Sequence, residues 1–382
     1  MEFEHFIDKW GPEKILCVYD PATGMRGVTV IDNTAIGPGK GGIRMQPDVT
    51  VQEVFRLARA MTWKNALAQI PFGGAKSGIM ANPQSAQEKE AIMRAFARAI
   101  KPVVPSIYVA GPDMRTTELE MGQFSDELGT RQACTGKPAS MGGLPHELGS
   151  TGFGVAEATE VALEFAKIPV NGATVAIEGF GNVGTFASRF LSEKGAKIVA
   201  VSDSKGTIYN PNGLDVAKLE QTKAAKGTVT AYAEAGSRVL APEELFSLQC
   251  DVLIPGARPD AINQKNVNSV RAKLIVEAAN LPISEKCEKN EKKCEAILTE
   301  KKALIVPDVI ANAGGVISSY IEFIGGTKEQ MFKTVRDKIR TNTKLVLETG
   351  QSRKITPREA ALGIAQERVL AAMMKKGLPR GK

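Results

Sequence analysis

Residues 174–184 decide the fold, and they read Thr174-Val175-Ala176-Ile177-Glu178-Gly179-Phe180-Gly181-Asn182-Val183-Gly184. The first five residues are typical of a buried strand, because β-branched and apolar residues dominate them. The next six contain the pattern Gly-x-Gly-x-x-Gly, which is a weak signal when it stands alone. Here a helical pattern follows it, and a second strand ends at Asp203, 19 residues after Gly184. Strand, glycine-rich turn, helix and acidic residue in this order predict a dinucleotide-binding domain.

The three glycines have separate expected roles in this turn. Gly179 permits the tight turn, Gly181 lets a pyrophosphate approach the backbone, and Gly184 lets the helix pack closely on the strand. Asn182 and Val183 open the helix, whose first N–H groups would bind the pyrophosphate. An ordinary glycine-rich turn is the competing interpretation, and the flanking strand, helix and aspartate argue against it.

The coenzyme is predicted to be NAD or NADP, and the sequence leaves the choice between them open. Asp203 would normally bind the adenine-ribose hydroxyls and favour NAD. Ser202, Ser204 and Lys205 flank this aspartate. A lysine with neighbouring hydroxyls suits the 2′-phosphate of NADP.

The same half of the chain contains further apolar strands at residues 252–254, 274–276 and 304–306, separated by helical patterns. Strands that alternate with helices predict a parallel, doubly wound sheet, so a Rossmann-type α/β domain is expected here. A glycine-rich stretch from Gly136 to Gly154 separates it from an N-terminal half that also mixes strands and helices. There, Thr50-Val51-Gln52-Glu53 predicts a capping box, in which the threonine and glutamate side chains each bond the other's backbone N–H.

Bulk composition is that of a two-domain globular protein and argues against several other classes. The chain has 382 residues, of which 43% are hydrophobic and 24% charged, and its apolar runs are too short to cross a membrane. The net charge is +7, but the basic residues are interspersed with acidic ones, so neither nucleic acid nor membrane is expected as a partner. The acidic N-terminus lacks a signal-peptide pattern, which predicts a cytoplasmic location. Five cysteines at irregular spacing predict reduced thiols, and with two histidines neither a metal site nor a histidine-dependent hydrolase is expected.

Three lysines beside glycines or in apolar segments suggest a site for carboxylates. They are Lys40 in Gly37-Pro38-Gly39-Lys40-Gly41-Gly42, Lys64 in Met61-Thr62-Trp63-Lys64-Asn65 and Lys76 in Gly73-Gly74-Ala75-Lys76-Ser77-Gly78. An amine that loses water in such surroundings has a lowered pKa and can act as a base or electrostatic catalyst. A single lysine would be interpreted as a surface residue, but three within 37 positions favour a site. Asp113, which follows a Gly-Pro pair, is either a turn former or a proton-transfer group.

Taken together, these segments resemble the amino-acid dehydrogenases that include the glutamate, leucine, phenylalanine and valine dehydrogenases. The resemblance runs in the same order over nearly the whole chain, and the lysine-bearing motifs are its most specific part. It rests on Gly37 to Arg44, Met61 to Lys64, Gly73 to Gly78, Pro112-Asp113, Thr135-Gly136-Lys137-Pro138, Gly179 to Gly184 and Asn312-Ala313-Gly314-Gly315-Val316. It implies an NAD(P)-dependent enzyme that reversibly deaminates an amino acid.

The resemblance also implies roles for individual residues. Lys76 matches the catalytic lysine, which polarises the 2-oxo group and activates water or stabilises the carbinolamine. Asp113 matches the aspartate that moves protons to and from the amino group, and Lys64 matches the lysine that holds the α-carboxylate. The family's two domains enclose a cleft, and the coenzyme contacts there are implied for Thr151, Ala257, Asn280 and Asn312.

The implied substrate is glutamate, because glutamate dehydrogenases carry a lysine and a serine that match Lys40 and Ser319 and bind the distal carboxylate. Val316 is implied to line the same substrate site. The alternative is a leucine-, valine- or phenylalanine-type enzyme, since Thr23-Gly24-Met25-Arg26 resembles the leucine-type enzymes and Glu147 stands where glutamate enzymes usually carry arginine. A buried lysine without a carboxylate partner is costly, so the pocket is expected to reject leucine.

Domain organisation and assembly are further expectations from the resemblance. Residues 1–138 with 330–382 would form an α/β domain for substrate binding and oligomerisation, completed by the returning C-terminal helices. Residues 139–329 would form the Rossmann-type NAD(P) domain. The expected small-molecule partners are glutamate, 2-oxoglutarate and ammonia, and the expected assembly is a homohexamer.

Overall fold

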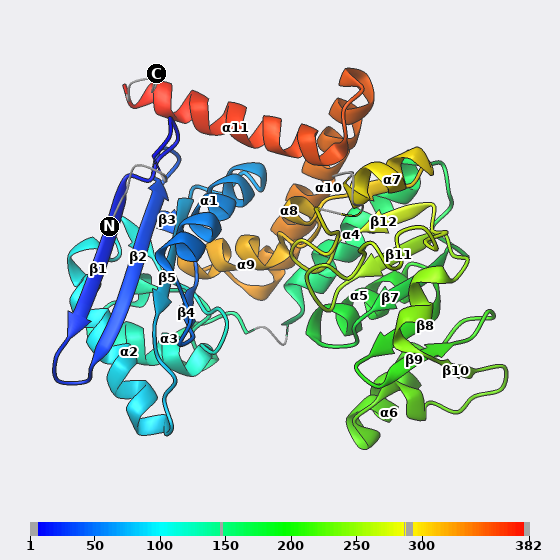
Figure 1. Cartoon of the computed structure of the whole chain (residues 1–382), viewed down its shortest axis with the longest axis horizontal. Helices are drawn as coiled ribbons and strands as arrows, with labels where there is room; N and C mark the ends of the chain where they lie inside the picture. Colours follow the sequence, from blue (N-terminus) through cyan, green and yellow to red (C-terminus); the bar gives the residue numbers. More distant parts are fainter. Residues whose placement is uncertain (1–6, 146–147, 286, 288–292, 378–382) are drawn as a thin grey trace. The chain divides into compact units, whose positions relative to one another are not determined.

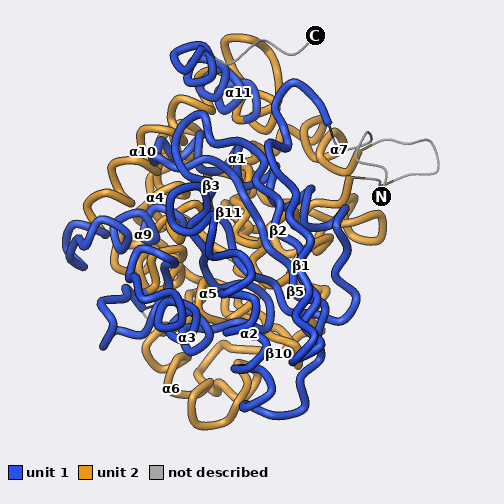
Figure 2. The backbone as a smooth tube through the Cα atoms, turned by 90° about the vertical axis from the view of Figure 1, so that its left-hand side faces the viewer, with its two compact units in different colours: residues 1–148, 316–331, 362–382 blue, residues 149–315, 332–361 orange. Residues whose placement is uncertain are grey.

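The computed structural model describes residues 7–145, 148–285, 287 and 293–377 (Figure 1). Glu147, on which the leucine-type alternative partly rests, lies outside the described residues. The chain divides into two compact units, coloured separately in Figure 2. Unit 1 comprises Met1–Leu148, Val316–Met331 and Leu362–Lys382, and unit 2 comprises Gly149–Gly315 and Phe332–Ala361. The sequence predicted that the chain returns to the first domain once, at residue 330. In the structure, unit 1 contains two C-terminal segments, Val316–Met331 and Leu362–Lys382.

Unit 1 is built on a mixed sheet with the strand order β1-β2-β5-β3-β6, in which β4 also pairs with β5. The β1–β2 and β2–β5 pairs are antiparallel, and the pairs made by β3 and β4 are parallel. The strands are β1 (Lys14–Asp20), β2 (Met25–Asn33), β3 (Gly39–Lys40), β4 (Ile43–Met45), β5 (Gly73–Ile79) and β6 (Tyr108–Val109). The helices are α1 (Val51–Leu67), α2 (Ala86–Ile100) and α3 (Glu118–Leu128), with 3-10 helices at Lys101–Val103, Arg131–Ala133 and Ala139–Met141.

Strand β2 shows that this sheet is covered on both faces. Val28 and Val30 pack into an apolar cluster that includes Val54 of α1. Met25 and Ile31 belong to a second cluster with residues of α2 and α3. Strand β2 is therefore buried between α1 on one face and α2 and α3 on the other.

Helix α1 begins after Thr50, but the predicted capping box is only half formed. Thr50 Oγ1 accepts a hydrogen bond from Glu53 N at 3.1 Å, as predicted. The Glu53 carboxylate instead pairs with the guanidinium of Arg44. The prediction of a reciprocal bond was wrong because a charged guanidinium is a stronger partner for a carboxylate than a backbone N–H.

Helix α1 packs closely on strand β5 because two glycines of the strand face it. A Cβ on Gly74 would lie 2.0 Å from Thr62 Oγ1, and a Cβ on Gly78 would lie 2.8 Å from Val54 Cγ2. Lys76 lies midway between these glycines, and residues two apart on a strand share a face. The glycines of this motif therefore place Lys76 on the face of the sheet that α1 covers.

Unit 2 contains the predicted doubly wound sheet, with the strand order β10-β9-β8-β7-β11-β12-β13. The pairs from β8 through β7 to β13 are parallel, and β9 and β10 add an antiparallel ribbon at one edge. The strands are β7 (Thr174–Glu178), β8 (Lys197–Asp203), β9 (Gly206–Tyr209), β10 (Arg238–Leu240), β11 (Val252–Pro255), β12 (Leu274–Val276) and β13 (Leu304–Val306). The strands predicted at 174–178, 197–203, 274–276 and 304–306 are confirmed with these bounds.

The helices of unit 2 alternate with its strands, as a doubly wound fold requires. They are α4 (Ser150–Phe165), α5 (Asn182–Glu193), α6 (Val216–Lys226), α7 (Cys294–Glu300) and α8 (Asp308–Ala311), with 3-10 helices at Val229–Ala231 and Pro242–Ser247. Helices α9 (Gly314–Phe323), α10 (Lys328–Arg353) and α11 (Pro357–Lys375) each contribute residues to both units.

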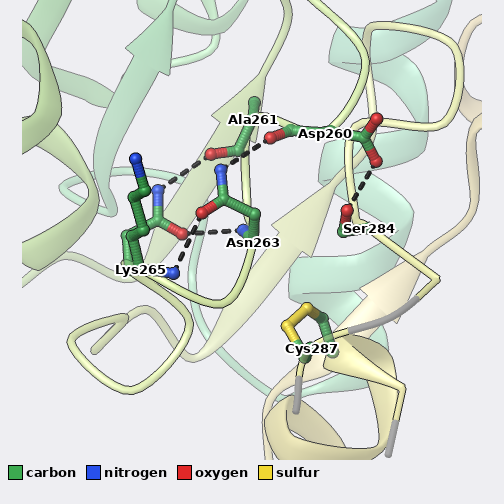
Figure 3. Close-up of a disulfide and its surroundings, with 8 residues drawn as sticks. Asp260, Ala261, Asn263, Lys265, Ser284 and Cys287 are labelled. Carbon is green, nitrogen blue, oxygen red and sulfur yellow. Dashed lines mark hydrogen bonds between the residues drawn. A yellow bond between two sulfur atoms is a disulfide. The ribbon is translucent and has the colours of Figure 1, made fainter. Parts of the chain in front are cut away.

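Cys287 and Cys294 form a disulfide, which corrects the prediction that the cysteines are all reduced (Figure 3). Their Cα atoms lie 4.9 Å apart, a separation that a disulfide can span. Sequence spacing could not show this, because a separation of seven residues does not by itself decide whether two thiols meet. Beside the disulfide, Ser284 Oγ donates a hydrogen bond to Asp260 at 2.6 Å (Figure 3).

Candidate functional site

Lys40 and Lys76 lie on neighbouring strands of unit 1 and on the same face of its sheet. Lys40 of β3 is in register with Gly74 of β5, two residues before Lys76. Side chains two positions apart on a strand share a face, so both amines lie on the side that α1 covers. Their exposed fractions are 4% and 6%. The register of β3 against β5 therefore brings the two predicted lysines together.

Lys76 forms a buried ion pair with Asp113. Lys76 Nζ lies 2.9 Å from Asp113 Oδ1, and Arg44 Nε donates to Asp113 Oδ2 at 2.7 Å. Burial lowers the pKa of Lys76, and the attraction of Asp113 opposes this only in part. Burial would raise the pKa of Asp113, but Lys76 and Arg44 outweigh it and hold that pKa below its usual value. The aspartate is therefore kept ionised beside an amine that releases its proton more easily than it would in water.

Lys40 is a buried amine that donates to a backbone carbonyl, Ala110 O, at 2.6 Å. Burial lowers the pKa of Lys40 to about 7. Gly111 makes room for the amine, since a Cβ there would lie 2.6 Å from Lys40 Nζ. A carboxylate brought beside this amine would favour its charged form and raise its pKa.

The other residues predicted to contact the amino acid lie on helices of unit 1. Lys64 is half-buried in the last turn of α1. Val316 and Ser319 are half-buried on α9, where the ring of the next residue, Tyr320, lies 6.1 Å from that of Phe72. Phe72 directly precedes β5, so this part of α9 packs beside the strand that carries Lys76. Unit 1 thus holds every residue predicted to act on the amino acid.

A buried ion pair between Lys137 and Glu322 was missed by sequence reasoning. Lys137 Nζ lies 2.5 Å from Glu322 Oε1, with side-chain exposures of 3% and 2%. Glu322 also accepts hydrogen bonds from Gly136 N at 2.9 Å and Leu144 N at 3.0 Å. It follows Ser319 by three residues on α9, so the pair anchors the helix turn that carries this serine. The sequence did contain one signal for this pair, because Glu322 is the charged residue in the otherwise uncharged segment of α9.

The glycine-rich turn of unit 2 has the geometry predicted for a pyrophosphate site. Gly179 has φ +93°, which glycine adopts without strain. A Cβ on Gly184 would lie 1.8 Å from the Gly179 carbonyl oxygen, whereas a Cβ on Gly181 would meet no described residue within 4 Å. Helix α5 begins at Asn182, and the side chain of the next residue, Val183, is half-buried. Open space at the start of a helix suits a phosphate group, so these residues fit a dinucleotide.

The predicted nicotinamide-side residues gather in unit 2 as well. Asn312 Nδ2 donates to Asn280 Oδ1 at 3.0 Å, which brings the two predicted asparagines into contact. Thr151 lies in the first turn of α4, where a Cβ on Gly315 would approach its Oγ1 to 2.9 Å. The backbone N–H of Ala257 donates a hydrogen bond to the carboxylate of Glu178, at the end of β7, at 3.0 Å.

Asp203 ends strand β8, and Ser204 and Lys205 are exposed in the turn that follows. Lys223 Nζ lies 2.6 Å from its carboxylate. Burial would raise the pKa of Asp203, but Lys223 and two backbone N–H groups lower it to about 2. Asp203, the residue predicted to bind the ribose, is therefore ionised and already hydrogen-bonded to other groups of the protein.

Family models match most of the chain. Residues 142–377 match the model described as glutamate/leucine/phenylalanine/valine dehydrogenase, and residues 12–130 match the dimerisation domain of the same enzymes. The chain belongs to the Glu/Leu/Phe/Val dehydrogenase family. The predicted family, the α/β fold in two parts and the class of amino-acid dehydrogenase are thereby confirmed.

Relatives in the Glu/Leu/Phe/Val dehydrogenase family include enzymes named for either coenzyme. The glutamate dehydrogenase of Aeropyrum pernix is 41% identical over 365 residues, which cover 90% of this chain and 85% of the relative. The NAD-specific glutamate dehydrogenase of Staphylococcus aureus is 37% identical, covering 90% and 84%. The NADP-specific glutamate dehydrogenase of Saccharolobus shibatae is 38% identical, covering 91% and 84%. The prediction of NAD or NADP as coenzyme is confirmed at this level.

Solved structures in the Glu/Leu/Phe/Val dehydrogenase family share the fold. The hetero-hexameric glutamate dehydrogenase of Thermus thermophilus, in its Leu-bound form, gives a TM-score of 0.84 at 29% identity, covering 98% of this chain and 93% of that one. The L-tryptophan dehydrogenase of Nostoc punctiforme gives 0.73 at 27% identity, covering 95% and 97%.

Proposed function

We propose that this chain catalyses the reversible, NAD(P)-dependent oxidative deamination of L-glutamate to 2-oxoglutarate and ammonia. The observation that carries the proposal is the buried Lys76–Asp113 pair, with Lys40 buried on the same face of the sheet. An amine beside a carboxylate suits proton transfer, and a second buried amine suits a second carboxylate on the substrate. Relatives of 37–41% identity that are named glutamate dehydrogenases support the same reaction.

Lys76 and Asp113 do the proton work in this proposal. As an ammonium group, Lys76 polarises the 2-oxo group, and as an amine it accepts a proton from the water that attacks the imine. Burial lowers the pKa of Lys76, so the amine form is reached more easily than for a lysine in water. Asp113, 2.9 Å away, accepts the proton of the substrate amino group and returns it in the reverse direction.

Unit 2 would hold the coenzyme. When it is bound, its nicotinamide would accept the hydride. The open backbone at Gly181 and the first N–H groups of α5 would take the pyrophosphate. Ala257 would lie along the ribose, and Thr151 with the Asn280–Asn312 pair would contact the nicotinamide end. Unit 1 would hold the amino acid.

Glutamate specificity rests on the buried amine of Lys40. The distal carboxylate of glutamate, shared with Ser319, would restore the charge of Lys40, whose pKa burial has lowered to about 7. Lys64 would hold the α-carboxylate. A branched-chain substrate would bring an apolar group to Lys40 instead, and a buried cation without an anion is unfavourable.

A leucine-, valine- or phenylalanine-type activity is the second candidate, and Thr23-Gly24-Met25-Arg26 favours it. In the structure this stretch forms the β1–β2 hairpin, where Thr23 bonds the carboxylate of Asp20 at 2.6 Å. Arg26 precedes Val30, the partner of Lys76 across the sheet, by four residues. At about 3.3 Å for each residue the hairpin lies about 13 Å along the strand from Lys76, so Lys40 bears more directly on specificity.

Initial rates of reductive amination test the proposal. With ammonia, 2-oxoglutarate should be converted and 4-methyl-2-oxopentanoate should not, each measured with NADH and with NADPH. Lys76→Ala should abolish turnover, while Lys101→Ala, which changes an exposed lysine of unit 1, should leave it unchanged. Conversion of the branched-chain acid alone would favour the second candidate, and full activity of Lys76→Ala would refute the mechanism.

Assembly and location are also proposed. We infer a homo-oligomer because residues 12–130 match a dimerisation domain, and a homohexamer because the Thermus thermophilus relative is described as hetero-hexameric. In the part of the chain that the structure describes, helices long and apolar enough to cross a membrane are absent. The cytoplasmic location stays a prediction.

A further inference from the structure

Asp203 is the residue expected to bind the adenine ribose, yet the protein itself occupies its carboxylate. Oδ1 accepts hydrogen bonds from Lys205 N at 2.9 Å and from Thr228 Oγ1 at 3.3 Å. Oδ2 accepts from Lys223 Nζ at 2.6 Å and from Val229 N at 2.9 Å. A carboxylate has about four acceptor sites, and each oxygen here already has two donors.

The ribose hydroxyls of NAD(H) would therefore have to displace an internal donor in order to bond Asp203. The side chain is 7% exposed, so little of it can be reached without such a displacement. Charge-assisted hydrogen bonds such as that from Lys223 are among the stronger ones in proteins. Asp203 is better explained as an anchor that ties the end of β8 to the segment after α6.

The elements that this anchor joins carry lysines and a serine. Ser204 and Lys205 are exposed in the turn after β8, and Lys223 and Lys226 lie in the last turn of α6 or directly at its end. Lys223 pairs with Asp203, whereas Lys205 and Lys226 form no ion pair with the described residues. A phosphate monoester carries about two negative charges near neutral pH, and its oxygens accept from ammonium and hydroxyl donors.

We propose that this chain selects NADP(H), with Ser204 and Lys205 contacting the 2′-phosphate and Asp203 acting as a positioning residue for their turn. The inference rests on the proposed placement of the dinucleotide along Gly179 to Gly184. It goes beyond family membership, because the relatives include both NAD-specific and NADP-specific enzymes.

Calorimetry with nucleotide fragments tests the selection without turnover. At fixed ionic strength, adenosine 2′,5′-bisphosphate should bind the full chain at least about tenfold more tightly than 5′-AMP. Lys205→Ala should remove most of this difference while leaving 5′-AMP binding unchanged. Lys197→Ala changes an exposed lysine at the opposite end of β8 and should keep the difference intact.

Asp203→Asn separates positioning from direct contact. The amide cannot hold Lys223 as the carboxylate does, so the turn should loosen and the preference for the bisphosphate should fall, with 5′-AMP binding within about twofold of the wild type. A general loss of stability would not change the ratio of the two affinities in this way. Weaker binding of 5′-AMP itself would instead indicate that Asp203 bonds the ribose, and this result would overturn the inference.

The remaining outcomes are equally decisive. Equal affinities for the two fragments, or tighter binding of 5′-AMP, would overturn NADP(H) selection. Loss of the difference in Lys197→Ala would also overturn it, because the effect would then be general charge. Failure of both fragments to bind would overturn the selection together with the placement of the dinucleotide, and conversion of 2-oxoglutarate by the same preparation would show that the proposed reaction still stands.

Discussion

Replacement of Lys40 by methionine should stabilise the fold while it removes activity toward 2-oxoglutarate. Methionine is unbranched and resembles the aliphatic stem of lysine, so it can fill the same space without the charge. Lys40 is 4% exposed, and its Nζ donates to Ala110 O at 2.6 Å. The substitution therefore exchanges a buried amine for a buried thioether in closely packed surroundings.

The size of the gain follows from the pKa of Lys40, which burial lowers from 10.5 to about 7. At about 1.4 kcal/mol for each tenfold change, burial of the amine costs about 4 kcal/mol at about pH 7. The substitution removes this cost but also removes the bond to Ala110 O. Thr135 N still donates to that carbonyl at 3.0 Å, so the lost bond costs only about 1 kcal/mol. The free energy of unfolding should rise by about 3 kcal/mol.

The gain should depend on pH in one direction. Because the pKa of Lys40 is lower in the folded than in the unfolded chain, the cost of burial is full below about pH 7 and fades as the pH rises toward 10.5. Lys40→Met should therefore exceed the wild type in stability most clearly at about pH 7, and only slightly at about pH 10.

Urea unfolding at fixed protein concentration measures the effect at both pH values. Lys101→Met, at an exposed position of unit 1, is the matched control and should change the free energy of unfolding by less than about 0.5 kcal/mol. A destabilised Lys40→Met, or an equal gain at both pH values, would refute the reasoning about the buried amine. Retained activity toward 2-oxoglutarate would refute the role of Lys40 as ligand of the distal carboxylate.

Three further substitutions probe other contacts. Glu322→Gln should lower the free energy of unfolding by about 3 kcal/mol, because Lys137 is left charged and buried, and an unchanged urea midpoint would contradict this. Arg44→Met should raise the pKa of Asp113, which Arg44 now helps to lower, so the acidic limb of the pH–rate profile should move to higher pH. An unmoved limb would show that another group titrates there. Gly184→Ala should abolish coenzyme binding measured by calorimetry, since its Cβ would lie 1.8 Å from a backbone carbonyl oxygen, and normal binding would contradict the tight turn.

The Rossmann-type sheet could be predicted from the sequence because its signals are local. Strands 197–203, 274–276 and 304–306 are short runs dominated by apolar residues, and they have the predicted bounds. The turn at 179–184 depends on steric limits within six residues, which the glycine pattern records directly. The capping box at Thr50 was half right because the Glu53 carboxylate pairs with Arg44 and not with the backbone N–H of Thr50.

The contacts of the site needed the tertiary structure. The sequence named Lys76 and Asp113, but Arg44, which completes their ion-pair network, lies 69 positions from the aspartate that it bonds. Glu322 lies 185 positions from Lys137, and nothing in either segment alone predicts the pair. The disulfide and the occupied carboxylate of Asp203 were missed as well.

The sequence by itself thus determined the family and the order of strands and helices, and it named the candidate site residues. Backbone sterics and side-chain periodicity act over a few residues, so they can be read along the chain. The tertiary structure alone decided which amine is buried, which carboxylate is held ionised and which acceptor is already occupied. Burial and ion pairing depend on groups that only folding brings together, because desolvation and Coulomb attraction act through space and not along the chain.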